Sequence, residues 1–399
     1  ILEVNGKDNG DFGYHTGTRD KLDFGPRGGF VYNVGGRNDL IIRGGSGMFF
    51  NFPVSNVTYR QQFYNNSITA AFFPTNKCFT MQNPTCGATL EQIMSGAIPT
   101  PPQQTTIIAP DYRNPFGLQL TLGFQKQLGP LMAFDVDYTD LEEMRMVRSR
   151  DVNLFYDPVT GYNVDPAKGR PNPAWAQNQW LTSDGRTQTR NIASSFTRRF
   201  SHKFQAGLTY TRTLSQKDNT TGFGYFANNQ FNPNGDWANS TGLQDNTLRA
   251  NGIVMLPYDF SLAVSYFYGS GSRYNAASST TPYGKPGTNR LNIGAPITIP
   301  TAMLDRWDGP AVIGTGETWP RDALIGLPLH KVDLRLTSHV KIYNSLKAEI
   351  LFEVFNVFNR SNYGSYNTTI TNAAFGTPIA SSGNAYVPRS GQLGIRLAF

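Results

Sequence analysis

Residues 115–138 read PFGLQLTLGFQKQLGPLMAFDVDY, and in this stretch two runs of alternating apolar and polar side chains flank a short turn. Period-two alternation is typical of β-strands with one apolar and one polar face. The three residues Leu128–Pro130 separate the runs, which predicts a tight antiparallel hairpin. The apolar set is Phe116, Leu118, Leu120, Leu122 and Phe124, followed by Met132, Phe134, Val136 and Tyr138.

The polar face of this hairpin indicates which environment surrounds the sheet. Asp135 and Asp137 alternate with the apolar residues of the second arm, and burying both carboxylates in a β-sandwich would be costly. In a transmembrane barrel the same face lines a watery lumen while the apolar face meets lipid. Each arm is also about 10 residues long, the length of a tilted transmembrane strand. The stretch therefore predicts a transmembrane β-barrel.

The composition agrees with an all-β protein rich in turns. The chain has 399 residues, of which 13% are aromatic, 16% are charged and 40 are glycine. It contains no run of apolar residues long enough for a transmembrane helix, which a barrel of alternating strands does not need. The net charge of +7 fits a basic lumen and basic loops. Lys and Arg cluster only at Arg148–Arg150 and Arg198–Arg199, which argues against a nucleic-acid partner.

The same alternation recurs along the chain and predicts about twelve antiparallel strands. Short turns join the strands within each hairpin, whereas long polar inserts join one hairpin to the next. Short periplasmic turns and long extracellular loops are the arrangement of outer-membrane barrels. The further predicted strands are 26–34 with 40–50, 187–200 with 203–212, 246–256 with 261–271, 331–340 with 346–358, and 388–399. The main inserts are 51–114, 141–186, 214–245 and 272–329.

Several stretches, taken in order, resemble the C-terminal half of an Oar-like TonB-dependent receptor of the Gram-negative outer membrane. The resemblance covers the strands from about residue 25 to the end and does not extend to the long loops. The stretches are GPRGGFVY at 25–32, IRGGSGMFF at 42–50, FTRRF at 196–200 with LTYTR at 208–212, FEVFNVFN at 352–359, and PRSGQLGIRLAF at 388–399.

This resemblance implies a barrel of roughly 22 strands, filled by an N-terminal plug domain. It also implies energy from an inner-membrane TonB-type complex that contacts a short box on the plug. Since neither plug nor box is present, we expect residues 1–399 to be a single barrel-domain fragment. In it, residues 1–25 are a loop remnant and 26–399 hold the strands and loops. The terminal Phe399 resembles the signal that the barrel-assembly machinery reads.

Charged residues at alternate positions of the predicted strands are expected to face the lumen. They could form a salt-bridged wall, or they could line a path for a polar ligand or contact the plug. Glu349 and Arg396 lie at similar depth on consecutive strands, within reach of an ion pair. The set is Asp135, Asp137, Asp333, Arg335, Lys347, Glu349, Glu353 and Arg396.

All five tryptophans fall in the predicted long loops, where flat aromatic faces would suit a sugar or another amphipathic ligand. Aromatic girdles at the membrane interface and packing of the loops on themselves would explain the same positions. The tryptophans are Trp175, Trp180, Trp237, Trp307 and Trp319.

The remaining candidate motifs are a pair of cysteines, four histidines and a few aspartate groups. Cys78 and Cys86 lie close together in one polar loop, which favours a local disulfide in an oxidising compartment. The four histidines lie in no catalytic motif, so we predict neither an enzyme nor a cofactor. No aspartate group has the spacing of a calcium loop, and we predict no metal.

The sequence thus predicts part of a TonB-dependent transporter that moves a large solute, such as a glycan, peptide or chelate, across the outer membrane. Its expected partners are outer-membrane lipid, the barrel-assembly machinery, the TonB-type complex through the missing plug, and the solute. A passive porin or an export channel is the main alternative. A secreted carbohydrate-binding β-protein is a weaker alternative, and an outer-membrane enzyme is the weakest.

Overall fold

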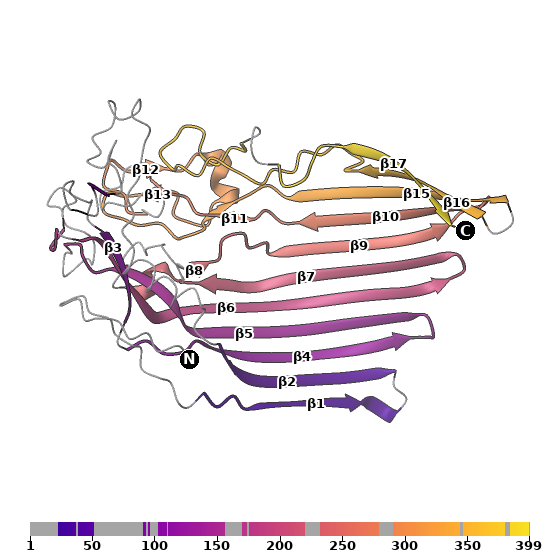
Figure 1. Ribbon diagram of the computed structural model, residues 1–399, viewed down its shortest axis with the longest axis horizontal. Coiled ribbons are helices and arrows are strands. Elements are labelled where there is room, and N and C mark those ends of the chain that lie inside the picture. The colour runs from indigo at the N-terminus through magenta and orange to yellow at the C-terminus, as the bar shows by residue number, and fades with distance from the viewer. Residues whose placement is uncertain are drawn as a thin grey trace.

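The computed structural model describes residues 23–36, 39–51, 91–92, 95, 103–109, 111–155, 170–173, 175–219, 232–278, 290–343, 346–379 and 384–398. Within them, eleven strands form one antiparallel meander in chain order (Figure 1). They are β1 (Arg27–Asn33), β2 (Leu40–Phe50), β4 (Phe116–Leu128), β5 (Met132–Asp151), β6 (Trp175–Ser201), β7 (Phe204–Asp218), β9 (Asn246–Met255), β10 (Phe260–Gly269), β15 (Leu329–Tyr343), β16 (Leu346–Phe355) and β17 (Ser390–Ala398).

Shorter elements lie mostly at the extracellular end of this sheet, and one short turn, between β1 and β2, lies at the periplasmic end. Two short strands, β3 (Gln103–Ile108) and β8 (Ala238–Asn239), pair with β6 and β7. The other short elements are β11 (Arg273–Tyr274) with β14 (Leu324–Ile325), β12 (Ile297–Thr298) with β13 (Val312–Ile313), and the 3-10 helices η4 (Pro233–Asp236) and η5 (Thr301–Arg306). A further 3-10 turn, η2 (Val34–Gly36), joins β1 to β2. None of the helices in the described ranges has the length and apolar character needed to cross a membrane.

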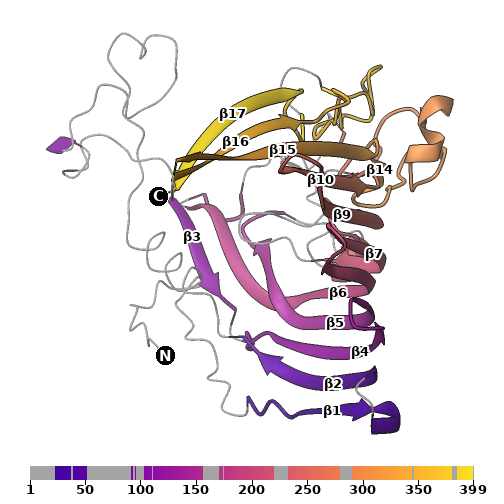
Figure 2. The same ribbon diagram turned by 90° about the vertical axis from the view of Figure 1, so that its right-hand side faces the viewer.

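The sheet curves strongly from β1 at one edge to β17 at the other (Figure 2). Its strands follow the arc of a barrel wall, and the described residues do not close that wall into a ring. The predicted all-β, antiparallel barrel architecture is thus confirmed, with eleven strands in the wall where about twelve were expected.

The hairpin of β4 and β5 has the predicted facing. Leu122 pairs with Tyr138 and Phe124 pairs with Val136, so the apolar residues of both arms share one face. Leu122 and Phe124 remain exposed in the isolated chain, with 46% of Leu122 accessible, and Val136 and Tyr138 are half-buried, as expected for a face that lipid covers. The turn lies one residue later than predicted, at 129–131, and Gly129 supplies its positive φ of 68°.

The apolar band on this outer face does not follow one cross-strand row. Its position relative to such a row shifts steadily from β4 to β15. One cross-strand row connects Phe124, Val136, Ser194, Tyr210, Leu248, Tyr268 and His330. On β4 this row is the periplasmic end of the apolar run, since Lys126 follows on the same face. On β15 the row is the extracellular end, and the apolar run continues below it with Val332, Leu334 and Leu336. Such a shift is what strands tilted to the barrel axis require.

Strands extend into all four predicted inserts, and two cases change the wall itself. The insert predicted at 141–186 is wrong at both ends, because β5 continues to Asp151 and β6 begins at Trp175. Charged residues end the apolar alternation there, yet Asp140 and Arg190 pair across the two strands, with 2.9 Å between Oδ2 and Nε. Within the predicted 51–114 insert, β3 pairs in parallel with β6 and buries Ile107 completely.

The largest buried apolar cluster lies outside the barrel wall, in the long loops. The described residues of 270–328 and 356–389 pack together as one unit, called the loop body here. Its core is Ala276, Ile299, Met303, Trp307, Ile313, Trp319, Ala323, Leu324, Tyr366, Ile370 and Phe375. Two loops that are distant in sequence therefore form a folded cap at the extracellular end of β10, β15 and β16.

Candidate functional site

The inner wall carries ion pairs on the face opposite the apolar band. On β2, Arg43 donates hydrogen bonds from Nη2 to both carboxylate oxygens of Asp137 on β5, at 2.9 and 2.7 Å. Asp135 lies 4.0 Å from the same nitrogen. A cavity of about 380 Å³ adjoins the pair, and Gly29, Gly45 and Thr121 help to line it. This part of the wall can accept a polar group beside a charge pair.

A second group of charges lies on β15, β16 and β17. Arg335 pairs with Glu353, which also accepts a hydrogen bond from Gln392. The Lys331 ammonium lies 2.7 Å from Asp333, and the Asp333 carboxylate also accepts the backbone N–H of Asn356 at 2.9 Å. These charges are therefore paired along the wall.

Glu349 and Arg396 are directly opposite each other on β16 and β17, as the sequence suggested. Their contact is loose, because 3.9 Å separates Nη1 from Oε2 and the Arg396 side chain is 77% exposed. Glu349 also lies 3.7 Å from His339 Nε2. Strand register places all the predicted lumen-facing charges on the inner face: Asp135, Asp137, Asp333, Arg335, Lys347, Glu349, Glu353 and Arg396.

Aromatic rings surround the Lys331 ammonium group near the extracellular mouth of this wall. Tyr386 comes from the loop body, and its ring lies 5.8 Å from that of Phe267 on β10. The ammonium group of Lys331 is 5.3 Å from the Tyr386 ring and 5.6 Å from the Phe355 ring. Because Phe267 and Lys331 share the inner face, this part of the loop body lies over the lumen wall.

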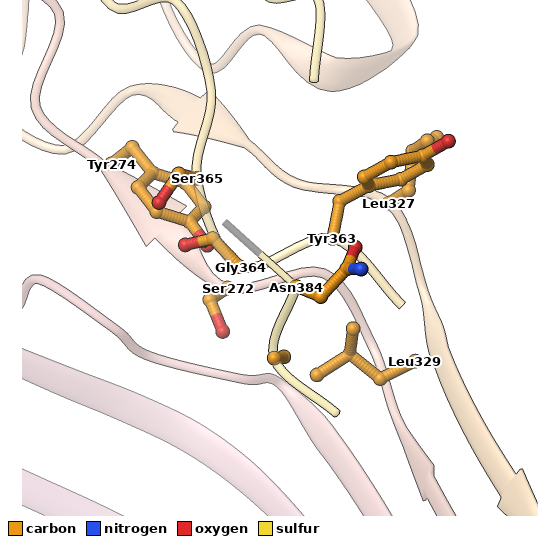
Figure 3. A pocket seen from close by; sticks show the side chains of 9 residues that line it. Ser272, Tyr274, Leu327, Leu329, Tyr363, Gly364, Ser365 and Asn384 are labelled. Atoms are coloured by element: carbon orange, nitrogen blue, oxygen red, sulfur yellow. The ribbon is translucent and has the colours of Figure 1, made fainter. Parts of the chain in front are cut away.

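A pocket of about 370 Å³ opens where the loop body meets the top of β15 (Figure 3). Figure 3 shows Tyr274 and Tyr363 on opposite sides of it, with the Asn384 amide between them in that view. No charged residue lines the pocket in the described part of the chain. Its walls are Ser272, Tyr274, Leu327, Leu329, Tyr363, Gly364, Ser365, Asn384 and Ala385.

The hydrogen-bonding groups of this pocket are partly engaged already. Tyr274 donates to the Gly364 carbonyl at 2.8 Å, and Ser272 accepts from Gln244 at 3.3 Å. Burial raises the pKa of Tyr274, so this hydroxyl stays neutral. Leu329 occupies an inward register position on β15, which places the pocket beside the lumen. The arrangement suits an uncharged polar group between two aromatic rings.

The tryptophans do not form one loop surface. Trp175 and Trp180 belong to strand β6, not to a loop as predicted. Trp237 stacks against Arg186, with the guanidinium carbon 4.0 Å from a ring centre. Trp307 and Trp319 are only 6% and 1% exposed, so they pack the core of the loop body and offer no surface to a ligand.

A charged network ties the loop body to the extracellular end of β7. Arg321 pairs with Asp218 at the end of β7, and its Nε lies 3.2 Å from the fully buried Asp322. Thr241 donates a hydrogen bond to Asp322 at 2.8 Å. Burial raises the pKa of Asp322 despite these partners. Arg290 and Asp236 form another buried pair that joins two loops.

Sequence reasoning missed Arg43 and the pocket. Arg43 alternates with Ile42 and Gly44, so its inward position was readable from the pattern of β2. The pocket brings together segments about a hundred residues apart and had no such local signal. Cys78, Cys86 and Phe399 lie outside the described residues. Among the residues that the structure describes, no group of three or more His, Cys, Asp or Glu side chains could hold a metal.

An apolar outer face, a charged inner face, short turns at one end and folded loops at the other define a β-barrel of the outer membrane. The sequence profile of the family described as outer membrane beta barrel domain matches residues 2–392, and the chain belongs to that family. No curated protein matches it.

Two solved structures have a similar fold. The outer membrane transporter YddB from Escherichia coli has a TM-score of 0.52 at 11% identity, over 92% of this chain and 39% of that one. A mutant of the ferric enterobactin receptor PfeA from Pseudomonas aeruginosa has a TM-score of 0.50 at 10% identity, over 94% of this chain and 39% of that one. The chain therefore spans about two-fifths of the length of these structures.

Proposed function

We propose that this chain is part of the barrel wall of a TonB-dependent transporter, and that a large solute crosses the outer membrane along its inner face. One observation carries the proposal: the loop body folds over the extracellular end of the wall and places Tyr386 and the neutral pocket above the charged inner face. A solute would meet the pocket first and the paired charges of the wall next. The family assignment favours a barrel protein over an enzyme.

The open edges of the sheet support a larger barrel. In hydrocarbon, the backbone groups of β1 and β17 need partners, so both edges must pair with further strands. Successive strands of the meander alternate in direction, and its eleven strands are an odd number. The first strand, β1, and the last, β17, therefore run the same way, from the extracellular to the periplasmic end. Antiparallel closure then requires an odd number of additional strands, and two copies of this wall would meet only through parallel seams.

The partners follow from that arrangement as part of the proposal. A plug domain within the completed barrel would contact the inner charges and connect to a TonB-type complex. Phe399 would present the terminal strand to the barrel-assembly machinery. The solute class stays open between a glycan, a peptide and a chelate, and the uncharged pocket favours a solute with neutral polar groups at its leading end.

The test compares gated and passive transport with the chain in its full natural protein. In liposome swelling, a plugged transporter should exclude the tetrasaccharide stachyose, and uptake of its solute by cells should stop when a protonophore removes the proton gradient. A porin would admit stachyose into liposomes without an energy source, which would overturn the proposal. Extraction of the protein from cells without detergent would overturn its membrane placement as well.

A further inference from the structure

Charged side chains gather on the lipid-facing side of β5, β6 and β7, just extracellular to the apolar band. We call Arg186, Arg190, Arg212 and Lys217, with Asp140 and Glu142, the basic patch. Register places all six on the outer face, because they pair in rows that continue from the lipid-facing residues of β4 or pair directly with Ile192. The three strands are neighbours in the sheet (Figure 1).

Only one of the four cations is neutralised within the patch. Arg190 donates to Asp140 at 2.9 Å and to Glu142 at 3.0 Å, and Glu142 also accepts from Gln188 at 2.7 Å. Arg186, Arg212 and Lys217 have no carboxylate partner in the described ranges. With four cations and two carboxylates, the patch carries a surplus of two positive charges.

The patch also lies at the right depth for lipid headgroups. Arg212 shares a cross-strand row with Ile192 and Tyr138, which end the apolar band on β6 and β5 because Arg190 and Asp140 follow them on the outer face. Directly below it, Tyr210 and Leu208 are 38% and 42% exposed and would meet acyl chains. Trp237 stacks on Arg186 at the same end, where outer-membrane barrels carry a girdle of aromatic residues.

We propose that the basic patch binds the phosphate groups of lipid A, the anionic lipid of the outer leaflet, on the outside of the barrel. Guanidinium and ammonium groups are the usual protein donors to phosphate, and Arg can bind it through two parallel N–H groups. The apolar residues beneath would hold the acyl chains of the same lipid. The site is distinct from the solute path, because it lies on the opposite face of the sheet. It depends on the outer-membrane placement and does not depend on the transported solute.

The test measures binding of diphosphoryl lipid A to the full natural protein that contains this chain, in detergent micelles, by native mass spectrometry. Replacing Arg212 and Lys217 together by glutamine should weaken binding about 30-fold, because each basic residue near an anionic surface contributes roughly fivefold. Lipid A stripped of both phosphates should bind the parent protein weakly and the double variant equally weakly. Inorganic phosphate at the same concentration should not compete, since it lacks the acyl chains.

The matched control is the double variant Lys341→Gln with Lys347→Gln. It removes two exposed cations that lie opposite each other on the inner face, and it should bind lipid A as the parent does. Equal binding of phosphorylated and dephosphorylated lipid to the parent would overturn the proposal, and so would parent-like binding by the Arg212/Lys217 double variant. Both results would leave solute uptake intact, so they would not count against the transporter function.

Discussion

Arg43 on β2 and Asp137 on β5 form an ion pair across the intervening strand β4, above Gly123. Both residues are register partners of Gly123, so the three positions form one row on the inner face. Arg43 Nη2 lies 2.9 and 2.7 Å from the two Asp137 oxygens. A Cβ atom on Gly123 would lie 2.0 Å from Asp137 Oδ1. Because Gly123 has no side chain, the Asp137 carboxylate can lie above it and reach Arg43.

Replacing Gly123 by alanine should lower the free energy of unfolding by about 1–3 kcal/mol, because the added methyl group overlaps the Asp137 carboxylate. The control is Gly117→Ala on the same face of β4, where the nearest atom, Leu141 Cδ1, is an ordinary 3.6 Å away. Urea unfolding of the protein refolded into lipid vesicles compares the two. Equal stability of both variants would show that the Arg43–Asp137 pair does not need the space.

Trp319→Ala should unfold the loop body and leave the barrel wall in place. Trp319 is 1% exposed and donates its indole N–H to the Ala276 carbonyl at 2.9 Å. Loss of a buried tryptophan costs roughly 3–5 kcal/mol. Hydrogen exchange should accelerate at 297–325 and at 363–376 while the wall strands stay protected. Trp237→Ala, which removes a partly exposed ring, should leave the loop body protected, and slow exchange in the Trp319 variant would contradict the account.

Asp322 should make the stability of the loop body depend on pH. Its pKa in the folded protein is raised by burial, so the folded state binds a proton more tightly than the unfolded state does. Stability is therefore highest below the ordinary pKa of an aspartate and falls as the pH rises through the raised value. Asp322→Asn should be at least as stable as the parent at pH 7 and should lose this dependence.

Thermal unfolding of the loop body between pH 4 and pH 8 checks this expectation. The variant Asp305→Asn changes an exposed carboxylate of the same loop body and should keep the pH dependence of the parent. A parent whose stability rises with pH over this window would mean that the ion pair with Arg321 outweighs the burial of Asp322.

The wall of the barrel was predictable from the sequence because lipid imposes a simple rule on it. Every outward side chain of β4 from Phe116 to Phe124 is apolar, so the period-two pattern is unbroken. The pattern failed where β5 and β6 leave the hydrocarbon, because Asp140 and Arg190 satisfy each other on the outer face and no apolar residue is needed. Strand length beyond the membrane depends on such pairs, which no local pattern reveals.

The loops were not predictable, because their structure depends on contacts between distant segments. Trp319 and Phe375 belong to one core although they lie in different inserts, and their sequence surroundings are polar and rich in turn residues. A tryptophan in a polar insert is equally compatible with a ligand surface and with a buried core. The parallel pairing of β3 with β6 is non-local in the same way.

The central claim is that one face of this sheet meets lipid and the other meets water. It is tested by placing arginine at two adjacent positions of β4 and measuring the stability of the folded protein in lipid vesicles. Leu122 lies on the outer face between Gly44 and Tyr138, whereas Thr121 faces inward beside the cavity near Arg43. Leu120 is a poorer site, because its register partner is Asp140 and an introduced arginine would find a carboxylate there.

Leu122→Arg should lower the free energy of unfolding by roughly 2–4 kcal/mol, because lipid offers the charge no partner near the middle of the membrane. Thr121→Arg should be tolerated, with a loss of about 1 kcal/mol or less, because its side chain enters the watery lumen. Equal tolerance at both positions would mean that neither face meets lipid. A reversal of the two results would mean that the strand is displaced by one residue, with its faces exchanged.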